Sequence, residues 1–176
     1  LMPAPPQEAA YAKRKAHALR FREASLRLLA PVISHRLALK DGKPIGFLED
    51  LYPGLSNFCL PFSRVQELYG AWQRYLDGVH LAVIGRRVYP YFGTYAPTRT
   101  SHLELFGTWL SQYKGEKSHA IDVGTGCGVL GFMLARSGFS RITSTDSNPN
   151  AVESVRRELL RMPESPPIEV QHADLL

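Results

Sequence analysis

The fold is decided by one stretch of the chain, AIDVGTGCGVLG at residues 120–131. An apolar strand ends there in a carboxylate, Asp122, and runs into a loop with glycines at positions 124, 126 and 128. Because glycine has no Cβ, a ligand can approach this backbone closely and the chain can take positive φ values. We expect the helix that follows, residues 129–137, to turn its free N–H groups toward the same spot. The stretch predicts a site for an adenosine-bearing cofactor, and its carboxylate favours a ligand with an amine or a sulfonium over a pyrophosphate.

Strands and helices alternate on both sides of this loop. The hydrophobic pattern predicts a capped helix that begins at Ser101, strands at residues 119–123, 141–145 and 168–172, and a second crossover helix at residues 149–161. This order implies parallel strands joined by right-handed crossovers. We therefore predict an α/β fold that contains the first three strands of an incomplete Rossmann-like sheet.

The N-terminal half has a different pattern, mainly helical with a β-hairpin at its end. Residues 7–30 read as a helix that Pro31 breaks or restarts, and Val65, Leu68, Trp72 and Leu76 form the apolar stripe of a helix from Ser63 to Asp77. A hairpin is expected from strands at residues 79–84 and 88–92. We predict three regions: a helical substrate-recognition domain at 1–85, a hairpin, linker and cofactor gate at 86–100, and the first half of a cofactor-binding domain at 101–176.

Three aspartates fall where the predicted parallel strands end: Asp122, Asp146 and Asp174. The carboxyl ends of parallel strands share one edge of a sheet, and ligands bind there. Asp146 is placed to accept both hydroxyls of a ribose, and Asp174 to accept from an adenine amine. The alternative for each acid is a helix cap or a turn residue.

Three segments carry a resemblance to a known family: DVGTGCG at 122–128, TDSNPNA at 145–151 and ADL at 173–175. They resemble the first motifs of class I S-adenosylmethionine methyltransferases, and more narrowly the HemK/PrmC-like "methyltransferase small" group, whose best-known members methylate a glutamine amide in release factors. The segment YAPTRTS at 95–101 also resembles the part of that group that closes over the cofactor. The similarity covers residues 86–176 well and the first 85 only in character.

The resemblance implies S-adenosyl-L-methionine as cofactor and methyl transfer to a planar amide or amine nitrogen of a protein glutamine or a nucleic-acid base. No metal is implied. The acceptor motif of that group, Asn or Asp followed by Pro-Pro-aromatic, follows its fourth strand. This sequence stops at Leu176, so we expect the catalytic residues beyond it and expect residues 1–176 alone to be inactive. The implied cofactor contacts are Asp122, Gly124, Thr125, Gly126, Gly128, Asp146, Ser147, Asn148, Asp174, Leu175, Arg99 and Thr100.

Two other functions stay open. The first is an NAD-binding Rossmann oxidoreductase, because residues 126–131 also match G-x-G-x-x-G and Asp146 follows at the usual distance. That register puts Asp122 inside a strand, where a carboxylate buried without a partner costs several kcal/mol. The second is a non-catalytic module that keeps the cofactor pocket while its basic helices bind RNA or a protein.

Composition adds few constraints. The net charge of +5 permits an acidic or nucleic-acid partner, although basic clusters interleaved with apolar positions indicate solvated helix faces. Two cysteines, Cys59 and Cys127, form no disulfide framework, which favours a reducing compartment, the cytoplasm. Cys127 as a nucleophile lacks any base tied to it by a motif. No apolar run approaches the roughly 18 residues of a membrane span. A half sheet exposes an edge, so self-association is expected.

Overall fold

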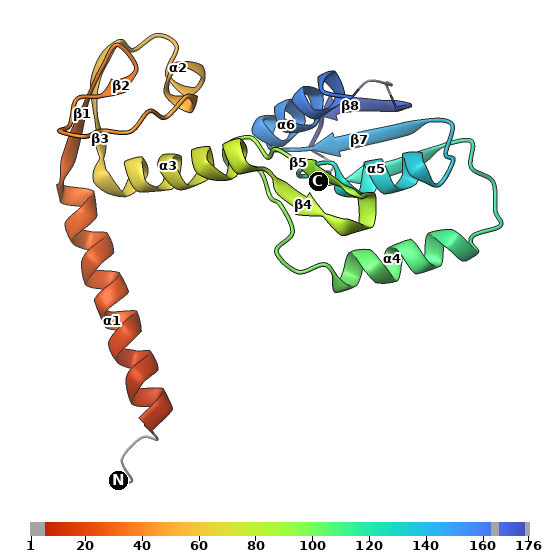
Figure 1. The fold of residues 1–176 in the computed structure, drawn as a ribbon, viewed down its shortest axis with the longest axis horizontal. Coiled ribbons are helices and arrows are strands. Elements are labelled where there is room, and N and C mark those ends of the chain that lie inside the picture. The colour runs from red at the N-terminus through yellow and green to blue at the C-terminus, as the bar shows by residue number, and fades with distance from the viewer. Residues whose placement is uncertain (1–5, 163–165, 175–176) are drawn as a thin grey trace. The chain divides into compact units, whose positions relative to one another are not determined.

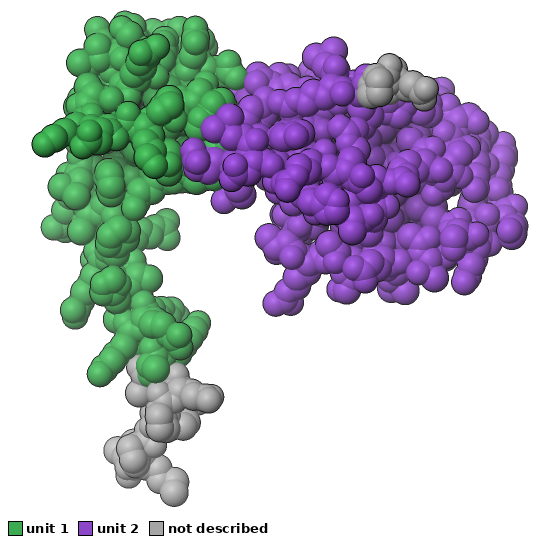
Figure 2. Space-filling model, in the orientation of Figure 1, with its two compact units in different colours: residues 1–72 green, residues 73–176 purple. Residues whose placement is uncertain are grey.

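The computed structural model describes residues 6–162 and 166–174. The chain divides into two compact units, residues 1–72 and residues 73–176 (Figure 2). The division into two compact units does not show which part recognises a substrate. The functional regions expected at 1–85, 86–100 and 101–176 therefore stay predictions.

The first unit is less helical than its sequence indicates. Helix α1 (Pro6–Arg27) is followed by an antiparallel sheet in the order β2-β1-β3, with the short helix α2 between its strands. The bounds are β1 (Leu29–Ile33), β2 (Arg36–Leu37), α2 (Phe47–Leu51), β3 (Asn57–Pro61) and α3 (Phe62–Asp77). The expected helix 7–30 was therefore wrong at its end, because Pro31 lies inside strand β1, opposite Cys59 of β3. The carbonyl of Pro31 accepts from Ala38 N at 2.9 Å, just beyond the end of β2. The N–H that a proline lacks would point to the same side of the strand, where β2 no longer needs a donor.

The second unit starts at Gln73, within α3, and the expected hairpin follows in a shorter form. Strands β4 (Val79–Leu81) and β5 (Arg86–Val88) pair antiparallel, and a 3-10 turn at Ala82–Ile84 joins them. Gly85 ends that turn with a φ of 64°, a value that favours glycine. Arg86 and Arg87, which lie between the two expected strands, belong to β5 instead.

The three parallel strands were predicted correctly. Strands β6 (Ala120–Val123), β7 (Ile142–Asp146) and β8 (Ile168–His172) lie side by side in that order (Figure 1). The helices are α4 (Ser101–Gln112), α5 (Val129–Arg136) and α6 (Pro149–Leu160). Helix α4 takes Thr100, not Ser101, as its N-cap residue. Pro149 is in the first turn of α6, as expected.

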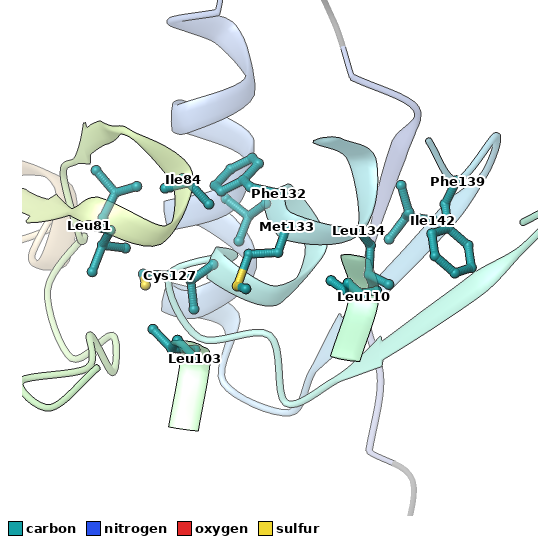
Figure 3. Packing of buried hydrophobic residues seen from close by; sticks show 13 residues of the cluster. Leu81, Ile84, Leu103, Leu110, Cys127, Phe132, Met133, Leu134, Phe139 and Ile142 are labelled. Carbon is teal, nitrogen blue, oxygen red and sulfur yellow. The ribbon is translucent and has the colours of Figure 1, made fainter. Parts of the chain in front are cut away.

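One hydrophobic core supports this sheet. Both α5 and α6 pack on β7, and the core continues from the hairpin through α5 to the start of β7, as Figure 3 shows for Leu81, Ile84, Phe132, Met133, Phe139 and Ile142. On the opposite face, Ile121 and Val123 are each 61% exposed, and among the described residues β6 is an edge strand. Self-association through this apolar edge stays a prediction.

Candidate functional site

The glycine loop makes its turns with positive φ values, as expected. Gly126 has a φ of 53°, and a Cβ built on it would lie 3.0 Å from the carbonyl oxygen of Tyr95. Gly124 has a φ of 71°, and a Cβ there would meet nothing within 4 Å. Gly126 is therefore required by a close approach of the backbone, whereas Gly124 borders open space.

The N–H groups of this loop are not available to a ligand. Each one from residue 124 to residue 128 donates to an acceptor of the protein at 2.8–3.0 Å: Gly124 and Thr125 to Thr145 O, Gly126 to Asp146 Oδ2, Cys127 to Tyr95 O, and Gly128 to Thr125 O. In the first turn of α5, Gly131 donates to Asp122 Oδ2 at 3.1 Å. The expectation that the helix turns its free N–H groups toward the ligand was therefore wrong for Gly131. No cradle for an anion forms from those N–H groups.

Asp122 lies beneath the loop. It is 3% exposed, and its Oδ2 accepts from Thr125 Oγ1 at 2.7 Å and from Gly131 N. Burial raises the pKa of Asp122, whereas these two hydrogen bonds act to lower it. Next to it, across the strands, the hydroxyl of Ser144 is buried with no hydrogen-bond partner among the described residues. The expected attraction of Asp122 for an amine of the ligand stays a prediction.

Asp146 ties the loop to the next turn. It ends β7, where its Oδ2 accepts from Gly126 N and its Oδ1 from Asn148 N, both at 2.9 Å. Each carboxylate oxygen has a second lone pair, so the group can still accept from a ligand. The position of Asp146 is therefore compatible with both predicted roles, a turn residue and an acceptor for a ligand.

A pocket opens at the carboxyl ends of the strands. Its volume is about 330 Å³, near the lower end of the range for small-molecule sites. It is lined by residues at the ends of the three strands or directly after them: Val123, Gly124, Thr145, Asp146, Ser147, Ala173 and Asp174. The structure thus brings Gly124, Asp146, Ser147 and Asp174 together, while Leu175 lies outside the described residues.

Of the remaining expected contacts, Asn148 and Thr100 have structural roles. Asn148 caps α6 by accepting from Asn150 N at 3.0 Å, and it donates to Gly93 O at 2.9 Å. Thr100 donates to Glu104 Oε1 at 2.8 Å, and Arg99 is exposed. None of these three side chains lines the pocket. Their contacts with a cofactor stay predictions.

Cys127 is unsuited to be a nucleophile. It is 1% exposed, and burial raises its pKa to about 11, so the unreactive thiol dominates near neutral pH. Both Cys59 and Cys127 are free thiols. A cytoplasmic location stays a prediction.

None of the described helices is long and apolar enough to cross a membrane. Within residues 6–162 and 166–174, no group of three His, Cys, Asp or Glu residues is placed to hold a metal ion.

One element beside the site was not predicted from the sequence: a segment at residues 89–95, which we name the strap. It runs along one side of α6, where residues spaced by four accept its hydrogen bonds. Tyr89 N donates to Glu158 Oε1 at 2.9 Å, Tyr91 N to Ser154 Oγ at 3.0 Å, and Thr94 Oγ1 to Asn150 O at 3.1 Å. Ser154 and Glu158 are completely buried, and polar residues at helical spacing were the available signal. The strap ends at Tyr95, whose carbonyl accepts from the glycine loop.

Glu158 also fixes the hairpin to α6. Besides the strap N–H, it accepts from Arg86 at 3.2 Å and from Arg161 at 2.8 Å. A buried carboxylate with three donors is stable only while all of them are present, because a lost partner leaves an uncompensated charge. The glycine loop is therefore covered by a segment whose position is determined by α6.

The fold and the site together define a class of protein. A parallel sheet with a glycine-rich turn after its first strand and an acid after its second is a Rossmann-like domain for a nucleotide cofactor. Within that class, residues 104–176 match the family described as Methyltransferase small domain, a family of class I methyltransferases that generally depend on S-adenosylmethionine.

A curated relative supports the same assignment. The chain is similar to "Ribosomal protein L11 methyltransferase" from Heliobacterium modesticaldum, with 34% identity over 67 residues. The similarity covers 38% of this chain and 21% of the relative, so the chain spans about a fifth of the length of the protein it matches. The resemblance found in the sequence is confirmed at the level of the family.

Proposed function

We propose that this chain carries the cofactor-binding part of a methyltransferase that uses S-adenosylmethionine and methylates a planar amide or amine nitrogen. The observation that carries the proposal is the hydrogen bonding of the glycine loop. Its N–H groups donate to Thr145, Asp146, Tyr95 and Thr125, so they are not open to a phosphate. The pocket beside the loop instead presents the carboxylates Asp146 and Asp174.

The same observation weighs against the NAD alternative. A dinucleotide site binds its pyrophosphate through open N–H groups at the glycine turn and the helix N-terminus. The burial of Asp122 in a strand does not weigh against NAD, because its carboxylate has hydrogen-bond partners. Asp122 is in β6 and buried, but it has two donors. The case against NAD now depends on the occupied N–H groups.

The residues present fit S-adenosylmethionine. Gly124 borders the pocket without a Cβ and with open space beside it, which leaves room for the cofactor against the backbone. When bound, the cofactor would supply an electrophilic methyl group on a sulfonium, whose positive charge suits a site with two carboxylates. Asp146 would accept from the ribose hydroxyls through its remaining lone pairs, and Asp174 from the adenine amine.

The protein's part in the transfer would be alignment. Holding a donor and an acceptor in line in a dry pocket is worth on the order of 7–11 kcal/mol. The acceptor nitrogen is a glutamine amide or a nucleic-acid base in our proposal. The relative is named for a ribosomal protein, which supports a protein acceptor. A non-catalytic module that keeps the pocket while its basic helices bind RNA or a protein is the second candidate, and the absence of an acceptor motif from the whole protein would favour it.

Amide NMR of the chain tests the cofactor assignment even if binding is weak. S-adenosylhomocysteine, the demethylated product, is titrated to millimolar concentration, and NADH is titrated in parallel. We expect S-adenosylhomocysteine to shift the amide signals of Gly124, Asp146 and Asp174, with little change from NADH. Shifts from NADH alone, or no shifts from either compound, would contradict the proposal.

A further inference from the structure

Helix α1 is exposed over almost its whole described surface. From residue 10 to residue 29 every side chain is exposed except that of Ser25, which is 3% exposed. Exposed residues include large ones, with Tyr11 at 64% and Phe21 at 52%. Helix propensity alone stabilises a helix of 22 residues only weakly in water, and most helical stability in proteins comes from packing. This helix thus presents a surface suited to a partner.

Most of the net charge of the chain is in this helix. Its sequence contains six Lys and Arg residues and two acids, Glu8 and Glu23, which gives +4 of the total +5. The basic residues are Lys13, Arg14, Lys15, Arg20, Arg22 and Arg27. This positive charge favours a strongly anionic binding partner.

The basic residues surround the helix instead of forming one stripe. At about 100° per residue, the six side chains cover an arc of roughly 240° of the helix circumference. Leu19, Glu23 and Leu26 fall in the remaining arc. A membrane-surface helix needs an apolar face opposite its basic face, and here that arc contains an acid. A flat acidic protein surface could contact only a fraction of the basic arc.

The phosphates of a folded nucleic acid fit such a helix better, because they can surround a bound element and present negative charge to it from more than one side. Two aromatic side chains point to RNA in particular. Tyr11 and Phe21 lie within the basic arc, and both are exposed. Aromatic rings stack on unpaired bases, which RNA offers in its loops and bulges and a DNA duplex does not.

We propose that α1 is an RNA-binding helix, which contacts the phosphates of a structured RNA through its encircling basic residues and stacks Tyr11 and Phe21 on unpaired bases. The inference is independent of the cofactor site, since every residue it uses lies in α1. It assigns an interaction surface to a part of the chain that lies outside the family match at residues 104–176.

The test measures binding of the full chain to a fluorescent RNA hairpin with a single-stranded loop, by anisotropy at several salt concentrations. Lys13→Gln, Arg14→Gln and Lys15→Gln are combined in one variant, since glutamine preserves helix propensity. The control variant combines Lys40→Gln, Lys114→Gln and Arg141→Gln, which are exposed and remove the same charge outside α1. Circular dichroism compares the helix content of both variants with that of the parent chain.

We expect the α1 variant to lose affinity at least tenfold at ~0.1 M salt and to lower the slope of log K against log salt by about 2, near 0.7 per lost phosphate contact. The control should stay within about threefold. Equal losses in the two variants, or no binding of the hairpin, would overturn the proposal. So would equal binding of a DNA duplex, anionic vesicles or polyglutamate. Replacing Tyr11 and Phe21 by Ala should reduce the preference for the hairpin over the duplex; an unchanged preference would refute the stacking.

Discussion

Gly126 donates its backbone N–H to Oδ2 of Asp146 at 2.9 Å, so the loop after β6 is bonded to the acid that ends β7. The other oxygen of the same carboxylate accepts from Asn148 N. One side chain therefore holds two turns at the edge of the pocket before any ligand is present. Its effect on the fold and its effect on cofactor binding can be measured separately.

Asp146→Ala should lower the free energy of unfolding by about 1.5–3 kcal/mol, the range for hydrogen bonds to a charged group, because two N–H groups lose their acceptor. Hydrogen exchange without cofactor should speed up at Gly126 and Asn148. The amide of Gly124, which donates to Thr145 O, is the internal control. Unchanged exchange at Gly126 would show that the Asp146 contact is absent in solution.

A second prediction concerns the pH dependence given by Asp122. Since its pKa is raised above the ordinary 3.8, the folded protein binds this proton more tightly than the unfolded chain does. The contribution of Asp122 to stability is therefore complete below pH 3.8 and is lost as the pH rises through the higher folded value. Asn keeps an oxygen for Thr125 and Gly131 and cannot ionise, so Asp122→Asn should be relatively more stable at pH 8 than at pH 4.

Urea unfolding at a series of pH values measures this difference. Asp77→Asn, at an exposed position, is the matched control and should show no such trend. Asp122→Ala should be destabilised by about 1–3 kcal/mol at every pH, because it leaves buried donors without an acceptor. A difference between Asp122→Asn and the parent that does not vary with pH would contradict the assignment.

The sequence predicted the parallel sheet well for a physical reason. Short apolar runs separated by amphipathic helices leave few alternatives, and strand β8 was predicted to the residue. The antiparallel sheet of the first unit was missed because β1 contains Pro31, and a proline after a helical pattern reads as a break. The strap was missed because its contacts with α6 join residues about 60 positions apart, as between Tyr91 and Ser154.

The burial of Asp122 could also have been predicted from the sequence. In a strand, side chains alternate between faces, so Asp122 shares a face with Ala120 and lies opposite to Ile121 and Val123. Helix α5 packs on β6, and Asp122 faces its Gly131. The burial of Asp122 follows from this alternation. The occupied N–H groups do not, because their acceptors include Tyr95 O, which only the folded strap brings to the loop.

A third prediction compares two glycines of the second unit. Gly124 and Gly138 have φ values of 71° and 88°, and a Cβ on either would meet nothing within 4 Å. Changing either to Ala should cost a similar free energy, about 1–2 kcal/mol, because a residue with a Cβ is strained in this region. Only Gly124 borders the pocket, so only Gly124→Ala should weaken binding of S-adenosylhomocysteine. Equal binding by both variants would show that the cofactor does not lie against Gly124.

The last prediction concerns the expected gate at residues 95–101. Arg99 is exposed in the segment between the strap and α4, and trypsin should cleave after it in the absence of ligand. If this segment closes over the cofactor, S-adenosylhomocysteine should slow cleavage at Arg99 because the ordered backbone no longer fits the protease. Cleavage after Lys114, also exposed, is the control site in the same digest and should keep its rate. Equal slowing at both sites would indicate only general stabilisation, and an unchanged rate at Arg99 with saturating ligand would make residues 95–101 a plain linker.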